Sequence, residues 1–280
     1  MIKPIKKTFA ALGIAAMACL TPTPSQGETV QLISSDYTYS NNGYIEGAAQ
    51  TSGSKLGLGG KIRIFANDLS SSSDMVTPVA NINDAGSWDD NYTIVHNGGS
   101  GVTKVDLSTG YGVGSSSVSG TGVEGISSIF QYNGKDHFAA IDAHDDTIKF
   151  FEWGNQTPVA TGPNVGSNYT GLEVIANGPV TDLSKIPILV SRDFTDGAGN
   201  LDQYFDGQLV GEYQAGGSDT LTDISYNSGS GILTTSFKGG RARGGMVNYD
   251  FASHVVPEPG TAALIGLAAL GAYAVRRLRM

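Results

Sequence analysis

Residues 137–154 read HFAAIDAHDDTIKFFEWG, and this stretch decides the fold. Two apolar runs, residues 138–141 and 148–151, flank a short acidic connection, which is typical of two β-strands joined in a hairpin. Between the two chain ends, no stretch of ten or more residues repeats apolar positions at helical spacing, whereas residues 61–65 alternate with period two. The chain is therefore predicted to be all-β.

The same form occurs five times, in residues 54–68, 92–106, 137–154, 188–207 and 232–251. The second strands begin near Lys61, Val102, Thr147, Leu201 and Met246, at intervals of 41, 45, 54 and 45 residues. A repeat of this length with three or four strands has the size of one propeller blade. We predict a β-propeller of about five blades, in which residues 29–53 can supply a strand that closes the ring. A β-sandwich or jelly roll is the alternative, and a β-solenoid stays open.

The charge of the chain excludes one class of partner. The two ends hold six of the 17 basic residues and, with Glu258, one of the 26 acidic ones; this leaves 11 basic and 25 acidic residues between them, a net charge of −14. Such a body repels phosphates, so nucleic-acid binding is excluded, while divalent cations or cationic sugars are attracted. The only cysteine is Cys19, so a large core rather than disulfides must stabilise the domain.

Three polar segments are candidate binding sites. Asp193, Asp196 and Asp202 form an acidic loop that can ligate Ca²⁺, although the spacing is not that of an EF-hand and a plain hairpin turn is the favoured interpretation. Residues 142–146, DAHDD, can ligate a metal or stay solvated. Arg241 and Arg243 lie on a glycine-rich turn and can bind a sulfated or uronic polymer, or simply keep a sheet edge soluble.

Enzyme motifs are missing from the sequence, since there is no nucleophile elbow, no phosphate loop and no zinc-ligand spacing. A glycosidase needs only two acids, which separate blades can bring together without a local motif. Glu124, Glu152 and Glu173 lie near the predicted blade ends and are the acids to test first. We expect no catalytic residue and no resident cofactor other than Ca²⁺.

The N-terminal residues have the pattern of a secretory signal peptide. Three lysines precede the apolar residues 9–20, and small residues precede a cleavage site between Gly27 and Glu28. Residues 1–27 are therefore predicted to be a signal helix that is removed on export, and residues 28–255 the exported domain. A lipoprotein-type site that ends at Cys19 is the alternative.

The C-terminal residues combine three parts in order. Val256, Pro257, Glu258 and Pro259 precede an apolar segment, residues 261–275, and a basic cluster of Arg276, Arg277 and Arg279. Residues 256–280 resemble the PEP-CTERM sorting signal of Gram-negative bacteria. The resemblance implies an exosortase as processing partner, a single transmembrane helix in residues 261–275, export through the inner membrane, and a cell-surface or extracellular location, with the protein transiently or permanently anchored.

The resemblance also implies a role, because exosortase substrates are associated with exopolysaccharide production. We expect a non-enzymatic binding or structural protein of the exopolysaccharide layer. A glycoside hydrolase or polysaccharide lyase on the same scaffold is the first alternative, and a calcium-stabilised structural surface module is the second.

Overall fold

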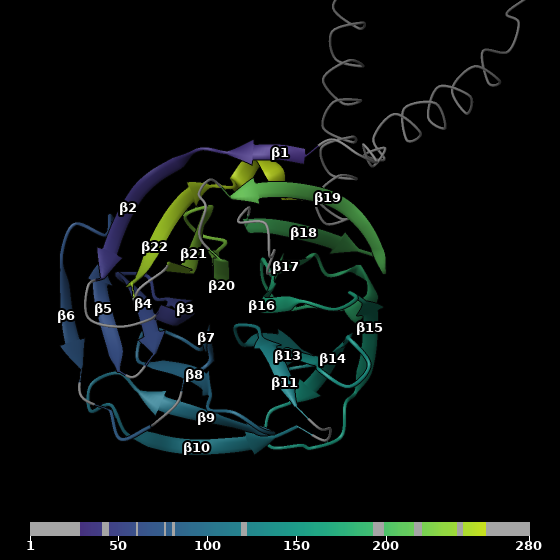
Figure 1. The fold of residues 1–280 in the computed structure, drawn as a ribbon. Coiled ribbons are helices and arrows are strands. Elements are labelled where there is room, and N and C mark those ends of the chain that lie inside the picture. Colours follow the sequence, from purple (N-terminus) through teal and green to yellow (C-terminus); the bar gives the residue numbers. More distant parts are fainter. Residues whose placement is uncertain are drawn as a thin grey trace, which may run out of the picture.

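The computed structural model is a five-bladed β-propeller, as predicted (Figure 1). It describes residues 29–40, 45–59, 61–75, 77–79, 82–118, 122–192, 199–215, 220–239 and 243–255. Each blade is an antiparallel sheet whose strands are numbered outward from the axis, with additions at the outer edges of blades 4 and 5. Short strands separated by Gly, Asn and Asp turns form these sheets. Their apolar residues alternate because successive side chains of a strand point to opposite faces of the sheet.

The first three blades follow the chain without interruption. Blade 1 contains β3 (Ile45–Gln50), β4 (Ser54–Gly59), β5 (Ile62–Ala66) and β6 (Ser72–Met75). Blade 2 contains β7 (Asp84–Ser87), β8 (Tyr92–His96), β9 (Gly101–Asp106) and β10 (Gly112–Ser117). Blade 3 contains β11 (Val123–Ile126), β12 (Phe130–Tyr132), β13 (Lys135–Asp142), β14 (Thr147–Glu152) and β15 (Ala160–Asn164), with β12 paired beside β11 on β13.

The last two blades take their outer strands from the beginning of the described chain. Blade 4 contains β16 (Tyr169–Val174), β17 (Ile188–Arg192), β18 (Gly199–Phe205) and β19 (Gln208–Ala215), and β1 (Thr29–Leu32) pairs in parallel with β19. Blade 5 contains β20 (Thr220–Asn227), β21 (Ile232–Gly239) and β22 (Arg243–Asp250), and β2 (Ser34–Ser40) pairs antiparallel with β22. A strand from residues 29–53 thus closes the ring, as the sequence indicated.

The five predicted hairpins are the second and third strands of the five blades, namely β4–β5, β8–β9, β13–β14, β17–β18 and β21–β22. Their residues Lys61, Val102, Thr147, Leu201 and Met246 lie in or next to the third strand of each blade, which confirms the repeat. The innermost strands β3, β7, β11, β16 and β20 surround the axis and contact one another in that order (Figure 1).

Apolar side chains fill the spaces between neighbouring blades. Phe150 and Leu172 belong to the cluster between blades 3 and 4, while Phe138 and Ile94 belong to the cluster between blades 2 and 3. At the closing junction Met246 of blade 5 packs with Ile45 and Phe65 of blade 1. Because alternate side chains of one strand enter different clusters, each blade contributes to two interfaces.

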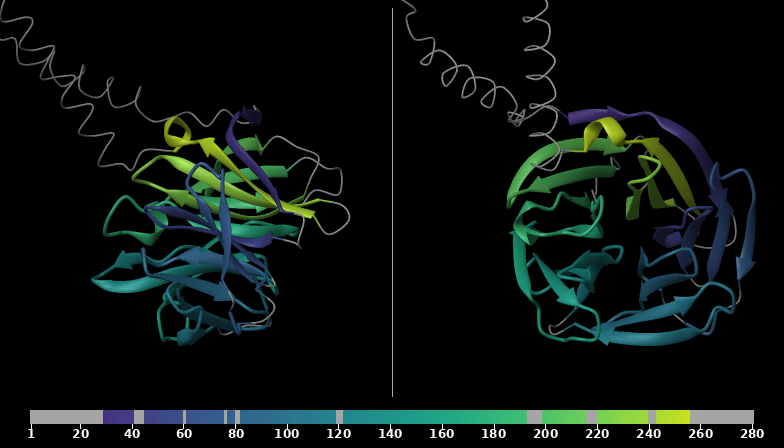
Figure 2. Two further views of the ribbon diagram at one scale, coloured as in Figure 1. Left: turned by 90° about the vertical axis from the view of Figure 1, so that its left-hand side faces the viewer. Right: turned by 180° about the vertical axis from the view of Figure 1, so that it is seen from behind.

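The two ends of the described chain meet on β19 (Figure 2). β1 lies along its outer edge, and the Tyr213 hydroxyl donates to the carbonyl of His254, 3.0 Å away. The helical turns in the described part are two 3₁₀ segments, η1 (Leu183–Lys185) and η2 (Ala252–His254), and none of its helices is long and apolar enough to cross a membrane. The predicted signal helix and the transmembrane segment 261–275 lie outside the described residues.

Candidate axial binding site

Two aspartates lie buried at the propeller axis. Asp84 begins β7, and Asp223 follows a β-bulge in β20. Asp84 accepts from the N–H groups of Ala85, 2.8 Å away, and of Ile126; Asp223 accepts from Ile224 at 2.7 Å, Ala48 at 2.6 Å and Ala85 at 3.2 Å. The donors come from four of the five inner strands, so the two carboxyl groups tie these strands together.

The two aspartates form a pair of buried acids. Burial raises the pKa of both carboxyl groups far above the usual range, and their proximity raises that of Asp223 further. A hydrogen bond joins the two side chains, and it lowers the pKa of Asp84 while raising that of Asp223. The pair therefore retains at least one proton at neutral pH, because two like charges side by side in a dry interior cannot both ionise.

A third buried acid, Glu173 of β16, lies at the wall of a cavity of about 320 Å³. Glu173 is 1% exposed; its Oε2 accepts from the Ser128 hydroxyl at 2.8 Å and its Oε1 from its neighbour Val174 N–H at 3.1 Å. Burial raises the pKa of Glu173 to about 8, and the charge of Asp223 contributes in the same direction. We call this cavity the axial pocket.

Polar groups from all five blades line the axial pocket: they include Gln50, Ser87, Ser128, Glu173 and Asn227. Ser87 joins neighbouring blades, since its hydroxyl accepts from Gln50 N–H at 2.7 Å and its N–H donates to the Ser128 hydroxyl at 3.1 Å. A small cavity with hydroxyl, amide and carboxyl groups converging on it has the chemistry of a site for a polar ligand.

Trp88 and two aspartates complete the wall and rim of the pocket. The Trp88 ring carries the Lys104 ammonium 3.5 Å from its centroid and packs edge to face with Trp153 at 4.8 Å, so neighbouring side chains already occupy it. Asp89 and Asp90 are exposed at the rim. The Ser52 hydroxyl and N–H, each 2.7 Å from Asp90, lower the pKa of its carboxyl.

Of the three acids that the sequence singled out, only Glu173 lies in the pocket. Glu124 is exposed on β11, and Glu152 forms an ion pair with Lys135 at 2.7 Å on the surface. Asp84 and Asp223 were missed as site residues. They are 139 residues apart and have no local motif, so only the inner-strand position of both residues could have indicated their meeting.

The predicted calcium loop lies mostly outside the described residues, which end at Arg192 and resume at residue 199. Asp202 is described: it is fully buried in β18, where its carboxylate pairs with Arg192 and accepts from the Tyr169 hydroxyl at 3.2 Å. Ca²⁺ binding by the loop stays a prediction. Arg241 and the side chain of Arg243 also lie outside the described part, as does the sorting motif.

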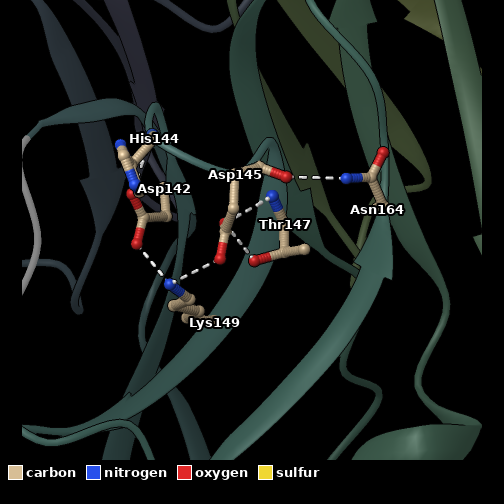
Figure 3. Close-up of polar contacts among 6 residues, drawn as sticks. All are labelled: Asp142, His144, Asp145, Thr147, Lys149 and Asn164. Carbon is tan, nitrogen blue, oxygen red and sulfur yellow. Dashed lines mark hydrogen bonds and ion pairs between the residues drawn. The ribbon is translucent and has the colours of Figure 1, made fainter.

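The DAHDD segment is the β13–β14 turn (Figure 3). Lys149 pairs with Asp142 and, at 3.1 Å, with Asp145, while the N–H of His144 donates to Asp142 at 2.9 Å. One ammonium thus pairs with two of the carboxylates. Among the described residues no three His, Cys, Asp or Glu side chains are grouped so that they could hold a metal ion.

A second cavity, of about 480 Å³, lies between blades 3 and 4. Phe150, Leu183, Ile188 and Tyr204 belong to its apolar lining, and Asp206, which also lines it, is already paired with Lys185. It offers fewer polar groups that converge on one point, so the axial pocket is the stronger candidate site.

Comparison with known proteins identifies the end of the chain. Residues 255–279 match the model of the PEP-CTERM protein-sorting motif. The chain carries a PEP-CTERM sorting motif. This motif indicates an exported protein that an exosortase sorts, with a membrane-anchored C-terminal sorting signal, and it confirms the resemblance found in the sequence.

The propeller itself has relatives only in fold. No curated protein matches the chain. Glutaminyl cyclase from Myxococcus xanthus is 16% identical, with a TM-score of 0.52 over 80% of this chain and 99% of that one. A chain of a mitotic checkpoint complex is 10% identical (TM-score 0.48; 79% and 96% covered), and hydrazine synthase from Kuenenia stuttgartiensis is 13% identical (0.42; 76% and 58%). At such identity the cyclase likeness shows the fold alone.

Proposed function

We propose that this protein is an exported, non-enzymatic binding protein of the extracellular polysaccharide layer, and that it holds a sugar unit of the polymer in the axial pocket. The signal peptide 1–27 directs its export, and the PEP-CTERM segment 256–280 anchors it until an exosortase processes it. Its place of action is then the cell surface or the surrounding matrix.

One observation carries the binding role: hydroxyl, amide and carboxyl groups from five blades converge on one cavity of about 320 Å³. Sugars present many hydroxyl groups, which both donate and accept, so Ser87, Ser128 and Asn227 suit them. The volume is at the lower end of ligand pockets, which span about 300–1,000 Å³, and fits a short segment of a polymer.

Glu173 favours a second candidate function. A carboxyl group that keeps its proton at neutral pH, as a pKa of about 8 implies, has the form of a general acid for glycoside cleavage. Cleavage also needs a second carboxylate, and Asp89 and Asp90 at the rim are the lining residues of that type. The calcium-stabilised surface module remains the third candidate and depends on Asp193 and Asp196.

Incubation with the exopolysaccharide of the producing strain distinguishes these roles. The processed protein is used, or the full chain in a detergent without sugar head groups, and the polymer is assayed for bound protein and for new reducing ends. Retention without new reducing ends supports the binding role. New reducing ends that disappear in Glu173→Gln but persist in Glu124→Gln establish the enzyme instead. If the polymer neither retains the protein nor is cleaved, both the binding role and the enzyme are contradicted.

A further inference from the structure

The axial pocket has an unbalanced charge. Its described lining residues include three acids, Glu173, Asp89 and Asp90, and no Lys, Arg or His. Behind Glu173 lies the Asp84–Asp223 pair, which adds two further carboxyl groups at the axis. A cation inside the pocket would therefore meet carboxyl groups on the wall, at the rim and behind the wall.

Two described lysines that contact lining residues of the pocket are occupied elsewhere. Lys104 lies over the rings of Trp88 and Tyr92, at 3.5 and 4.2 Å from their centroids. Lys55 is buried and donates to the Gln50 amide oxygen, so the amide stands between this ammonium and the pocket. Neither residue lines the pocket, and no residue in the described lining supplies a cationic group, so we assign that group to the ligand.

We infer that the axial pocket selects a sugar unit with a protonated primary amine, as in a 2-amino sugar, and that Glu173 is the residue that determines this specificity. The inference rests on the proposed binding function and names its ligand class. The Ser128 hydroxyl and the N–H groups of Ser128, Val174 and Tyr226 hold the Glu173 carboxyl in place at the wall of the pocket, where its negative charge can pair with an ammonium group. An N-acetylated sugar offers one neutral N–H in place of the charge, so it forfeits the charge-assisted hydrogen bond.

Binding of the amine should release a proton. In the free pocket the Glu173 carboxyl is protonated at neutral pH, because burial and Asp223 raise its pKa to about 8. An ammonium beside it favours the carboxylate, so at a pH low enough that the free amine is already fully protonated, the carboxyl O–H bond breaks and its proton leaves to solvent while the amine keeps all of its own protons. Tyr226 and Ser128 also face Glu173 and carry no charge that would oppose this step.

The test uses three β-1,4-linked oligomers of equal length whose sugars differ only at C2: glucosamine, N-acetylglucosamine and glucose. Calorimetry in two buffers of different ionisation enthalpy gives both the affinity and the protons released. Wild type should bind the glucosamine oligomer at least about tenfold more tightly than the other two, with proton release, as a charge-assisted hydrogen bond implies. Glu173→Gln should bring the three affinities to within about twofold and abolish the release, whereas Glu124→Gln, the matched change on β11, should keep both.

Several outcomes would overturn the inference. Equal affinity for the three oligomers in wild type, or a preference that survives in Glu173→Gln, removes the amine selectivity or its assignment to Glu173. Amine binding to wild type without proton release would also remove the assignment to Glu173. This measurement is made on wild type and does not depend on whether the variant folds. Retention on the host polymer with no binding of any oligomer overturns the inference alone, whereas no binding to polymer or oligomer overturns the proposed function as well.

Discussion

Asp84 and Asp223 accept from the same backbone N–H, that of Ala85, at 2.8 and 3.2 Å. One amide group thus binds both carboxyl groups of the pair, and the two aspartates belong to different blades. The inner strands are held at the axis by this polar centre as well as by the apolar clusters between the blades.

The pair should make the protein less stable as pH rises. The folded-state pKa values of Asp84, Asp223 and Glu173 are all raised, so the folded state binds more protons than the unfolded state between about pH 4 and pH 8. Their contribution to stability is fully present below the unfolded pKa and is lost as pH rises through the folded one. Thermal unfolding across this range should show a falling melting temperature.

Asp84→Asn is the control for this pH dependence. It removes one titrating group and one acceptor, so it should lower stability in acid, where wild type is best, and flatten the fall toward alkaline pH. A wild-type melting temperature that rises between pH 5 and pH 8 would contradict the raised pKa values.

Gly171→Ala should destabilise the propeller. A Cβ at this position of β16 would lie 2.6 Å from the Cα of Asp223 and 2.7 Å from the Ser191 hydroxyl oxygen, so the inner strands must move apart. The expected loss of unfolding free energy is about 1–3 kcal/mol by urea denaturation. Gly53→Ala is the matched control, because nothing lies within 4 Å of its Cβ position; equal losses for the two variants would refute the close packing at the axis.

Removal of the residues before 41 should prevent ring closure. It exposes the edges of β19 and β22 and deletes Asp36, which accepts from Asn248 at 3.3 Å. Hydrogen exchange should then become fast in β20–β22, and the melting temperature should fall. A chain that lacks residues 256–280 is the control, and it should melt like the full chain because every described strand ends before residue 256. Equal melting temperatures for the full chain and the chain that lacks the residues before 41 would contradict the prediction.

Calcium and the Asp202 ion pair can be separated by two variants. If Asp193 and Asp196 bind Ca²⁺, the ion raises the melting temperature by binding the folded state, and Asp196→Ala abolishes the rise. Asp202→Ala should cost about 3 kcal/mol with or without Ca²⁺, since it leaves Arg192 beside a vacated buried site. A melting curve that Ca²⁺ does not move would make the loop a plain hairpin.

Processing should depend on the host. In a host with an exosortase, the intact mass should correspond to a chain that begins near Glu28 and lacks the residues after Pro259. In a host without the enzyme, the tail should remain and hold the protein in the membrane fraction. Retention of the whole tail in the first host would refute the processing step.

The sequence predicted the repeat because the middle hairpin of each blade consists of two apolar runs that flank a turn. It predicted the axis less well, since the inner strands β7 and β11 have only four residues each and β3 is rich in small residues. Residues 84–88, DAGSW, are rich in residues that favour turns, yet residues 84–87 form the inner strand β7. The parallel pairing of β1 with β19, between residues 183 apart such as Thr29 and Glu212, follows from no local pattern. Glu173 was named as an acid to test, but its burial depends on all five blades.

The pairing of β2 with β22 has a consequence for the export of this protein. Closure joins the first described residues to nearly the last, as in the bond from the Ser35 hydroxyl to the carbonyl of Asn248, 213 positions along the chain. A chain that leaves the cytoplasm N-terminus first cannot form this contact until residue 250 has crossed. The translocating polypeptide therefore cannot close the propeller, and it can still pass through a narrow channel as an unfolded chain, until almost all of it is outside.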